Sequence, residues 1–145
     1  MKAKDFIHEQ VTAKSLVAAI PTVDANGATV DLQGFRGGCL FTGYIGTSLD
    51  SLSGSVKVEL EVEESEDDSA WTDVADADLS DYVAGTNDGC FALVDDAAED
   101  DAVFQTLYKG GKRYCRAVLN VTGTHTNGTP ITVISQKLGP DVAPQ

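Results

Sequence analysis

The sequence is poor in the residue types that most often carry chemistry or covalent cross-links. Among 145 residues it has one tryptophan, one methionine, two histidines, three cysteines and four prolines. Cys39, Cys90 and Cys115 stand in apolar, strand-like segments without Cys-x-x-Cys or Cys/His spacing, which argues against a disulfide framework and a zinc site. We therefore interpret them as buried free thiols, which suits a protein made in a reducing cytoplasm.

Long apolar stretches are also missing. No run approaches the roughly 20 residues that span a bilayer, and the N-terminal residues lack the continuous apolar core of a secretory signal. The Asn-x-Thr triplets at Asn120 and Asn127 are therefore interpreted as strand and turn residues rather than glycosylation sites. The sequence thus predicts no membrane partner.

Positive charge is scarce and lies mostly toward the two ends of the chain. Ten Lys and Arg stand against 23 Asp and Glu, which gives a formal net charge of −13. From Asp50 to Asp101 there are 18 acids and one cation, Lys57, so this stretch alone carries −17. Such an acidic body repels the phosphates of nucleic acids and anionic membrane surfaces. We expect no nucleic-acid partner.

No catalytic constellation is visible. His8 and His125 have no partner at a usable spacing, and nothing local places a cysteine beside either of them. The acids in residues 64–68 and 95–101 could hold calcium through oxygen ligands, but neither cluster has the EF-hand pattern with its turn glycine. The chain also lacks the several aromatic residues that line a sugar cleft. We predict no enzyme, no cofactor and no metal site, and we interpret the acids as solvated faces.

The clearest secondary-structure signal is a hairpin. In residues 56–63, valine and leucine at even positions alternate with charged residues at odd positions, which predicts a half-buried strand whose charged face lies in water. Residues 64–69 are typical of a turn, and residues 70–74 form a short return strand. This strand carries the only tryptophan. We predict that Trp71 is the core anchor, buried between two sheets.

Further strands are expected along the rest of the chain. The same signals predict them over residues 29–32, 39–45, 90–94, 103–108, 113–121 and 131–135. Asn26-Gly27 predicts a turn with positive φ between two strands, and residues 109–112 predict a tight turn that joins the strands on either side as a hairpin. The run 39–45 is apolar on both faces, as in a central strand. We therefore predict an all-β fold, an antiparallel, jelly-roll-like β-sandwich.

The predicted organisation is one domain with two extensions. Residues 1–20 are predicted to be an N-terminal arm, because their apolar residues follow neither a strand nor a helix period; residues 21–138 are the β-sandwich, and residues 139–145, with two prolines, are an extended C-terminal tail. Soluble proteins avoid exposed apolar arms unless a partner covers them. The predicted partner-binding residues of the arm are Phe6, Ile7, Val11, Leu16 and Val17. The alternative is a terminal helix or strand packed on its own core.

Several short motifs resemble one family of virion proteins. They are VDLQGF at residues 30–35, EESED at 63–67 and SAWTDV at 69–74, with further likeness at residues 4–8 and 133–137. These motifs resemble small capsid decoration, or cement, proteins of tailed bacteriophages. The resemblance implies a jelly-roll-like, often trimeric domain without a catalytic site, bound to the outer surface of the major capsid protein lattice. The acidic loop in residues 85–101 departs from the pattern.

The predicted function is therefore structural. We expect a protein, made in the host cytoplasm, that decorates and stabilises the phage capsid, with the major capsid protein and further copies of itself as partners. The alternative is a carbohydrate- or receptor-binding module of a virion appendage, because β-sandwiches serve both roles. A cement protein binds the assembled capsid, whereas a receptor module binds glycans or the host surface as an isolated protein.

Overall fold

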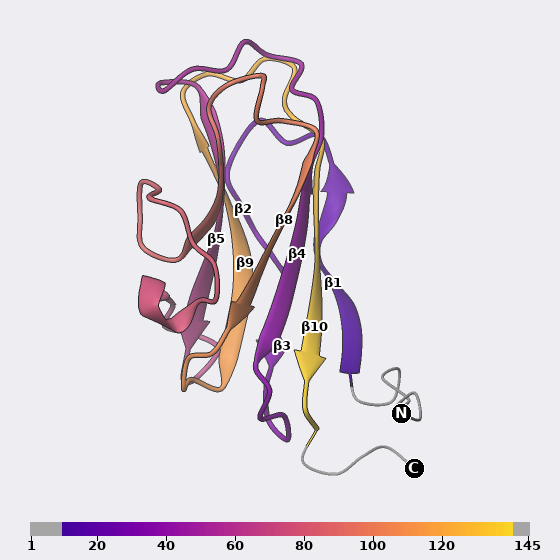
Figure 1. Cartoon of the computed structure of the whole chain (residues 1–145), viewed down its shortest axis with the longest axis vertical. Helices are drawn as coiled ribbons and strands as arrows, with labels where there is room; N and C mark the ends of the chain where they lie inside the picture. The colour runs from indigo at the N-terminus through magenta and orange to yellow at the C-terminus, as the bar shows by residue number, and fades with distance from the viewer. Residues whose placement is uncertain (1–9, 141–145) are drawn as a thin grey trace, which may run out of the picture.

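A computed structural model describes residues 10–140 of the chain. It is an antiparallel β-sandwich of two packed sheets (Figure 1). The strands are β1 (Gln10–Ala19), β2 (Ala25–Asn26), β3 (Val30–Asp31), β4 (Cys39–Ile45), β5 (Lys57–Ser65), β6 (Thr72–Asp73), β7 (Cys90–Val94), β8 (Ala102–Tyr108), β9 (Tyr114–Thr122) and β10 (Ile131–Leu138), with one 3-10 turn at Asp76–Asp78. The predicted fold class is confirmed, and the jelly-roll likeness stays a prediction.

The two sheets differ in strand order. One has four strands in the order β1-β10-β4-β8. The other has six, in the order β2-β9-β5-β6, with β3 also paired to β9 and β7 to β5. Strand β4 lies between β10 and β8, so its prediction as a central strand is confirmed. Among residues 10–140 no helix has the length and apolar character needed to cross a membrane.

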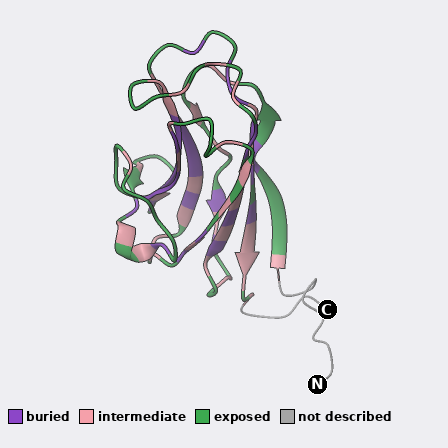
Figure 2. Cartoon of the chain, turned by 45° about the horizontal axis from the view of Figure 1, so that its top comes forward, coloured by how far each residue is buried: buried purple, intermediate pink, exposed green. Residues whose placement is uncertain are grey.

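The core lies between the sheets and is filled by alternate residues of the long strands (Figure 2). Phe41 of β4, Leu60 of β5 and Leu119 of β9 are almost fully removed from solvent. All three cysteines are buried and free, as predicted. The hydrogen bond of the Cys115 thiol with Cys39, together with burial, raises the pKa of Cys115, which keeps this thiol protonated and inert.

The prediction of a separate N-terminal arm is wrong for residues 10–19. They form β1, which pairs antiparallel with β10 throughout its length. Leu16 is only 8% exposed and belongs to the core. The sequence pattern concealed this strand because irregularities between Lys14 and Leu16, and again between Leu16 and Ala19, break the two-residue alternation. The sandwich therefore includes residues before 21, and Phe6 and Ile7 lie outside the described residues.

Two predicted turns have a different role from the one expected. Strand β8 pairs with β4, whereas β9 pairs with β5, so residues 109–113 cross between the sheets and close no hairpin. Strands β2 and β3 both pair with β9 and not with each other. At the turn before β3, Gly27 is needed for close approach, since a Cβ there would lie 2.6 Å from the carbonyl oxygen of Ala117.

Trp71 is not the core anchor, and this prediction is wrong. The residue is half-buried, and the Arg116 guanidinium lies 4.2 Å from the centre of its ring. Strand β6 does pair with β5 as a short hairpin, but its two residues are exposed at the edge of the sheet. The buried residue of this segment is the smaller Val74. An edge position explains this outcome, because only one side of such a strand has a neighbour.

Candidate partner-binding face

The outer face of the four-stranded sheet carries almost no charged residues. Because successive residues of a strand point to opposite sides, the inward Phe41 and Val133 leave their neighbours pointing outward. We define the outer face by the outward residues of β1, β4, β8 and β10: Thr12, Lys14, Val17, Leu40, Thr42, Tyr44, Val103, Gln105, Leu107, Thr132, Ile134 and Gln136.

The strand register arranges these side chains in rows across the sheet. One row runs Thr132, Tyr44, Val103; the next runs Ile134, Thr42, Gln105; and the third runs Gln136, Leu40, Leu107. Residues opposite one another in an antiparallel pair lie on the same side, so each row is a continuous strip. Apolar and uncharged polar side chains are therefore mixed within these three rows.

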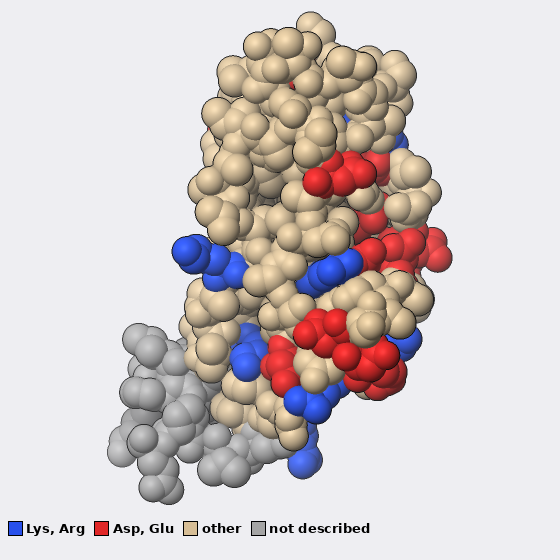
Figure 3. Space-filling model, turned by 180° about the vertical axis from the view of Figure 1, so that it is seen from behind, with Lys and Arg blue, Asp and Glu red and all other residues tan. Residues whose placement is uncertain are grey.

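Charge is nearly absent from this face. Lys14 is its only charged residue, although the chain as a whole has 33 charged residues, 10 basic and 23 acidic. In the view from behind (Figure 3), Asp and Glu gather along one flank of the molecule, and its upper part is almost free of charge. A surface without charge loses little hydration free energy when a partner covers it.

The polar side chains of the outer face are largely paired with groups of the same sheet. Gln105 Nε2 donates to Thr42 Oγ1 at 2.9 Å, and Thr132 Oγ1 donates to the Leu16 carbonyl at 3.1 Å. Gln136 Nε2 donates to Thr12 Oγ1 at 3.3 Å. Because these groups already have partners within the sheet, a docked surface need not replace all of their hydrogen bonds.

Several large apolar side chains on this face are open to solvent. Val17 is 65% exposed, Val103 63%, Tyr44 40% and Ile134 38%. Beside Tyr44 runs an apolar groove of about 310 Å³, lined by Ala18, Ala19, Ile20, Tyr44, Pro130, Ile131 and Thr132. Tyr44 donates its hydroxyl to Asp101 Oδ1 at 2.6 Å, and this bond raises the pKa of Tyr44. The ring is thus held in place as a neutral phenol.

The structure places the predicted arm residues of β1 in three different environments. Val17 lies on the outer face, Leu16 points into the core, and Val11 lines a small hollow of about 180 Å³ next to Ser135 and Lys137. Sequence reasoning missed the contributions of β4, β8 and β10. A signal was present, because the outward positions of these strands carry no charge in a chain with 23% charged residues.

The charged side of β5 is covered, which contradicts the prediction that it lies in water. Glu59 is 0% and Glu61 1% exposed. Glu59 accepts hydrogen bonds from the amide and hydroxyl of Thr86 at 2.6 and 2.7 Å and lies 3.3 Å from Lys57 Nζ. Glu61 Oε2 accepts a long bond from Asn87, at 3.4 Å, and its Oε1 has no partner. Burial raises the pKa of Glu61.

The buried Cys90 thiol lies near Glu59, but the two do not form a nucleophilic site. Burial first, and then the neighbouring Glu59, raises the pKa of the Cys90 thiol to about 12. The thiol is therefore protonated at neutral pH, whereas the thiolate is the reactive form. Residues 10–140 contain no group of three or more His, Cys, Asp or Glu placed to hold a metal ion.

Substitution of Glu61 by glutamine is expected to stabilise the protein by about 1 kcal/mol at pH 7, because it removes a buried, poorly paired charge. The folded-state pKa of Glu61 lies above the usual 4.5, so the acid contributes most below pH 4.5, and its contribution is lost as the pH rises through the folded pKa. The gain from Glu61→Gln should thus vanish below pH 4.5 and grow above it, measured by urea unfolding.

The matched control is Glu59→Gln, on the same face of β5. It leaves Lys57 without its carboxylate partner, and we expect it to destabilise the protein at pH 7. A Glu61→Gln variant that is less stable than the parent at pH 7, or whose effect does not change with pH, would contradict the assignment of an unfavourable buried carboxylate.

His125 lies beside two acceptors, which sequence reasoning missed. Its Nε2 lies 3.1 Å from the Thr122 carbonyl oxygen, whereas its buried Nδ1 lies 3.7 Å from Asp50 Oδ2 and has no hydrogen-bond partner among the described residues. Asp50 accepts the amide of Gly128 at 2.7 Å. This arrangement fastens the loop before β10 to the loop after β4.

Comparison with known proteins does not place the chain in a family. No protein-family model matches the sequence, and no curated protein matches it.

Proposed function

We propose that this protein is a non-enzymatic structural component of a phage virion, which decorates the capsid by binding the outer surface of the major capsid protein lattice. The observation that carries the proposal is the nearly uncharged outer face, which offers exposed apolar side chains on an internally hydrogen-bonded sheet. We infer the partner, the major capsid protein, from the resemblance of residues 30–35 and 63–74 to capsid decoration proteins. A trimeric, jelly-roll-like assembly belongs to the same proposal.

The proposed reinforcement of the capsid depends on many copies of the protein binding to one virion. A virion carries many identical binding positions, so a modest free energy at each one can add up to a large reinforcement of the shell. Particles that lack the protein are expected to release their DNA at a lower temperature than complete particles, and added purified protein should restore the difference. Equal release temperatures with and without the protein would contradict the proposal.

The outer face can be tested by placing a charge on it. Ile134→Glu and Val103→Glu each introduce a carboxylate that docking would have to strip of water, and we expect affinity for capsids to fall by at least about tenfold. Stability should change by only about 0.5 kcal/mol, because both side chains are solvent-exposed. Co-sedimentation with capsids measures binding, and thermal melting measures stability.

The matched control is Leu49→Glu, since Leu49 is 56% exposed but lies in the loop after β4 and not on the outer face. It should bind capsids as the parent does. If Leu49→Glu weakens binding and the outer-face variants do not, docking uses the loop end of the sandwich. If the isolated protein binds glycans and no variant affects capsid binding, the receptor-binding alternative is favoured.

A further inference from the structure

Strand β8 is an edge of the four-stranded sheet and pairs with a strand, β4, on one side only. The other side is covered at the C-terminal end of the strand. There the Ser80 amide donates to the Leu107 carbonyl at 3.0 Å, and the Leu107 amide donates to the Ser80 hydroxyl at 2.9 Å. The backbone amide and carbonyl of Leu107 therefore point away from β4.

The same geometry leaves two other residues of β8 with unused backbone groups. In an antiparallel pair, residues that bond to the neighbouring strand alternate with residues whose amide and carbonyl point away from it. Val103 and Gln105 are thus oriented like Leu107, and both are exposed. Within residues 10–140 their amides and carbonyls have no hydrogen-bond partner on this open side. The edge therefore offers a short row of free donors and acceptors.

The residues of β8 do not protect this edge. Edge strands usually carry a charged residue or a proline that prevents pairing with a second chain, but β8, with the sequence AVFQTLY, has neither. The opposite edge of the sheet differs. Strand β1 carries Lys14, and its Ser15 carbonyl already accepts the Ala28 amide at 2.8 Å. β8 is therefore the edge at which this sheet can be extended.

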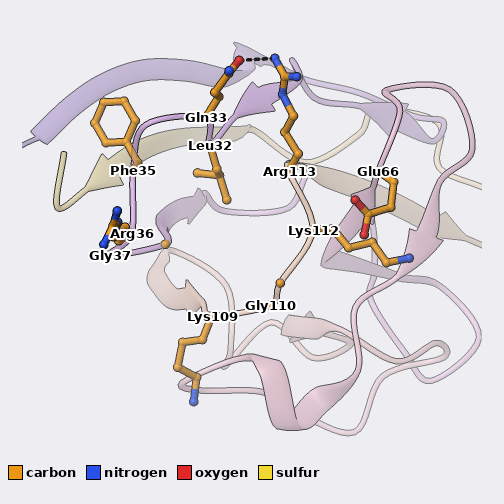
Figure 4. A pocket seen from close by; sticks show the side chains of 12 residues that line it. Leu32, Gln33, Phe35, Arg36, Gly37, Glu66, Lys109, Gly110, Lys112 and Arg113 are labelled. Atoms are coloured by element: carbon orange, nitrogen blue, oxygen red, sulfur yellow. Dashed lines mark hydrogen bonds between the residues drawn. The ribbon is translucent and has the colours of Figure 1, made fainter. Parts of the chain in front are cut away.

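The charges that flank β8 favour one relative orientation of two such strands. Glu99, Asp100 and Asp101 precede the strand, and Lys109 follows it. The Lys109 side chain extends away from the hollow of about 460 Å³ that lies between residues 32–38 and 109–113 (Figure 4). Two antiparallel copies of β8 bring the acidic end of each strand toward the basic end of the other, whereas parallel copies bring like charges together.

We propose that β8 pairs antiparallel with β8 of a second copy of this chain, so that two four-stranded sheets become one continuous sheet. A two-fold register that uses both free residues and avoids the covered Leu107 places Val103 opposite Gln105 of the second copy. Each such pair exchanges both backbone hydrogen bonds, and the two copies of Phe104 face each other at the two-fold axis. Phe104 is only partly buried within its own chain, so the contact covers more of both rings.

This contact goes beyond the proposed function and does not depend on it. It joins copies in pairs, whether the unit that pairs is a single chain or the proposed trimer. Because Val103 and Gln105 also belong to the outer face, the pairing joins the outer faces of two copies into one larger surface.

Sedimentation equilibrium of the full-length chain over a range of concentrations tests the pairing. We expect the mass to rise with concentration to twice that of the smallest unit. Gln105→Pro removes an amide that bonds to the second copy and none that bonds to β4. It should weaken self-association by at least about tenfold while the melting transition stays sharp. Ile134→Glu is the matched control, because it alters the outer face on β10, away from this edge, and should self-associate as the parent does.

A cross-link tests the register. Opposite residues of a non-hydrogen-bonded antiparallel pair have Cα atoms about 4.5 Å apart, within the range that a disulfide bridges. The three native cysteines are buried, so Phe104→Cys is expected to form a disulfide between two copies when oxidised glutathione is added. Val103→Cys should cross-link far more slowly, because its two copies are offset by two residues in this register.

Several outcomes would overturn the proposal. One is a single mass at all concentrations, and another is a Gln105→Pro variant that folds and self-associates as tightly as the parent. If Gln105→Pro does not fold, the cross-link decides, and equal rates for Phe104→Cys and Val103→Cys would contradict the pairing. If the parent does not self-associate but Gln105→Pro binds capsids more weakly, the edge pairs with the capsid protein and not with a second copy.

Discussion

Replacement of Leu16 by alanine is expected to lower the free energy of unfolding by about 2–4 kcal/mol. Leu16 is 8% exposed and packs in the core, where it lies opposite Val133 of β10. The substitution loses the burial of the removed carbons and leaves a cavity under the edge strand. Urea unfolding, followed by circular dichroism, measures the change.

Val17→Ala is the matched control on the same strand. Val17 is 65% exposed, so its truncation should change stability by about 0.5 kcal/mol or less. A chain that begins at Thr22 would lack all of β1, and we expect it to lose its sharp melting transition. If such a chain melts as sharply as the full chain, or if the two alanine variants are equally stable, β1 is not part of the cooperative unit.

Phe41→Ala is expected to lower the free energy of unfolding by about 3–5 kcal/mol, the largest effect of any single truncation considered. Phe41 is fully buried in β4, between β10 and β8. Neighbours on both sides of a central strand limit how far the backbone can move to close the cavity. Thermal and urea unfolding should agree on the loss.

Trp71→Ala is the informative comparison, because a tryptophan is the larger side chain. Its half-buried ring lies 4.2 Å from the Arg116 guanidinium, and a cation–π pair near the protein surface contributes about 0.5–1 kcal/mol. We expect a loss of about 1 kcal/mol, and we expect the native tryptophan fluorescence to be quenched readily by acrylamide. A greater loss for Trp71→Ala than for Phe41→Ala would restore Trp71 as the core anchor.

The strand positions were largely predictable from the sequence, because each depends on local alternation and flanking turn residues. The predicted strands at 39–45 and 90–94 coincide with β4 and β7, and the one at 103–108 differs from β8 by one residue. Strand β1 escaped prediction for a local reason as well. Its irregular register places Leu16 and Ser15 both among the buried residues, so no two-residue period survives.

Pairing was less predictable than position. Strands β8 and β9 are separated by a short glycine-containing connection that is typical of a hairpin, yet they belong to opposite sheets. The same composition serves a crossover, because the close approach of Gly38 and Gly110 to Tyr108 demands glycine whichever strand follows. The crossover from β8 to β9 lies beside the one from β3 to β4, and a hollow of about 460 Å³ lies between them.

The sequence by itself determined the fold class, the acidic character of the body, the burial of the three cysteines and the central place of β4, since composition and short-range periodicity carry this information. The tertiary structure alone decided which faces meet water. The alternation of apolar and charged residues in β5 predicts that Glu59 and Glu61 face solvent. In the structure both are covered by residues that lie far along the chain. The nearly uncharged outer face likewise arises only when β1, β10, β4 and β8 become neighbours, because the sequence does not show which strands share a sheet.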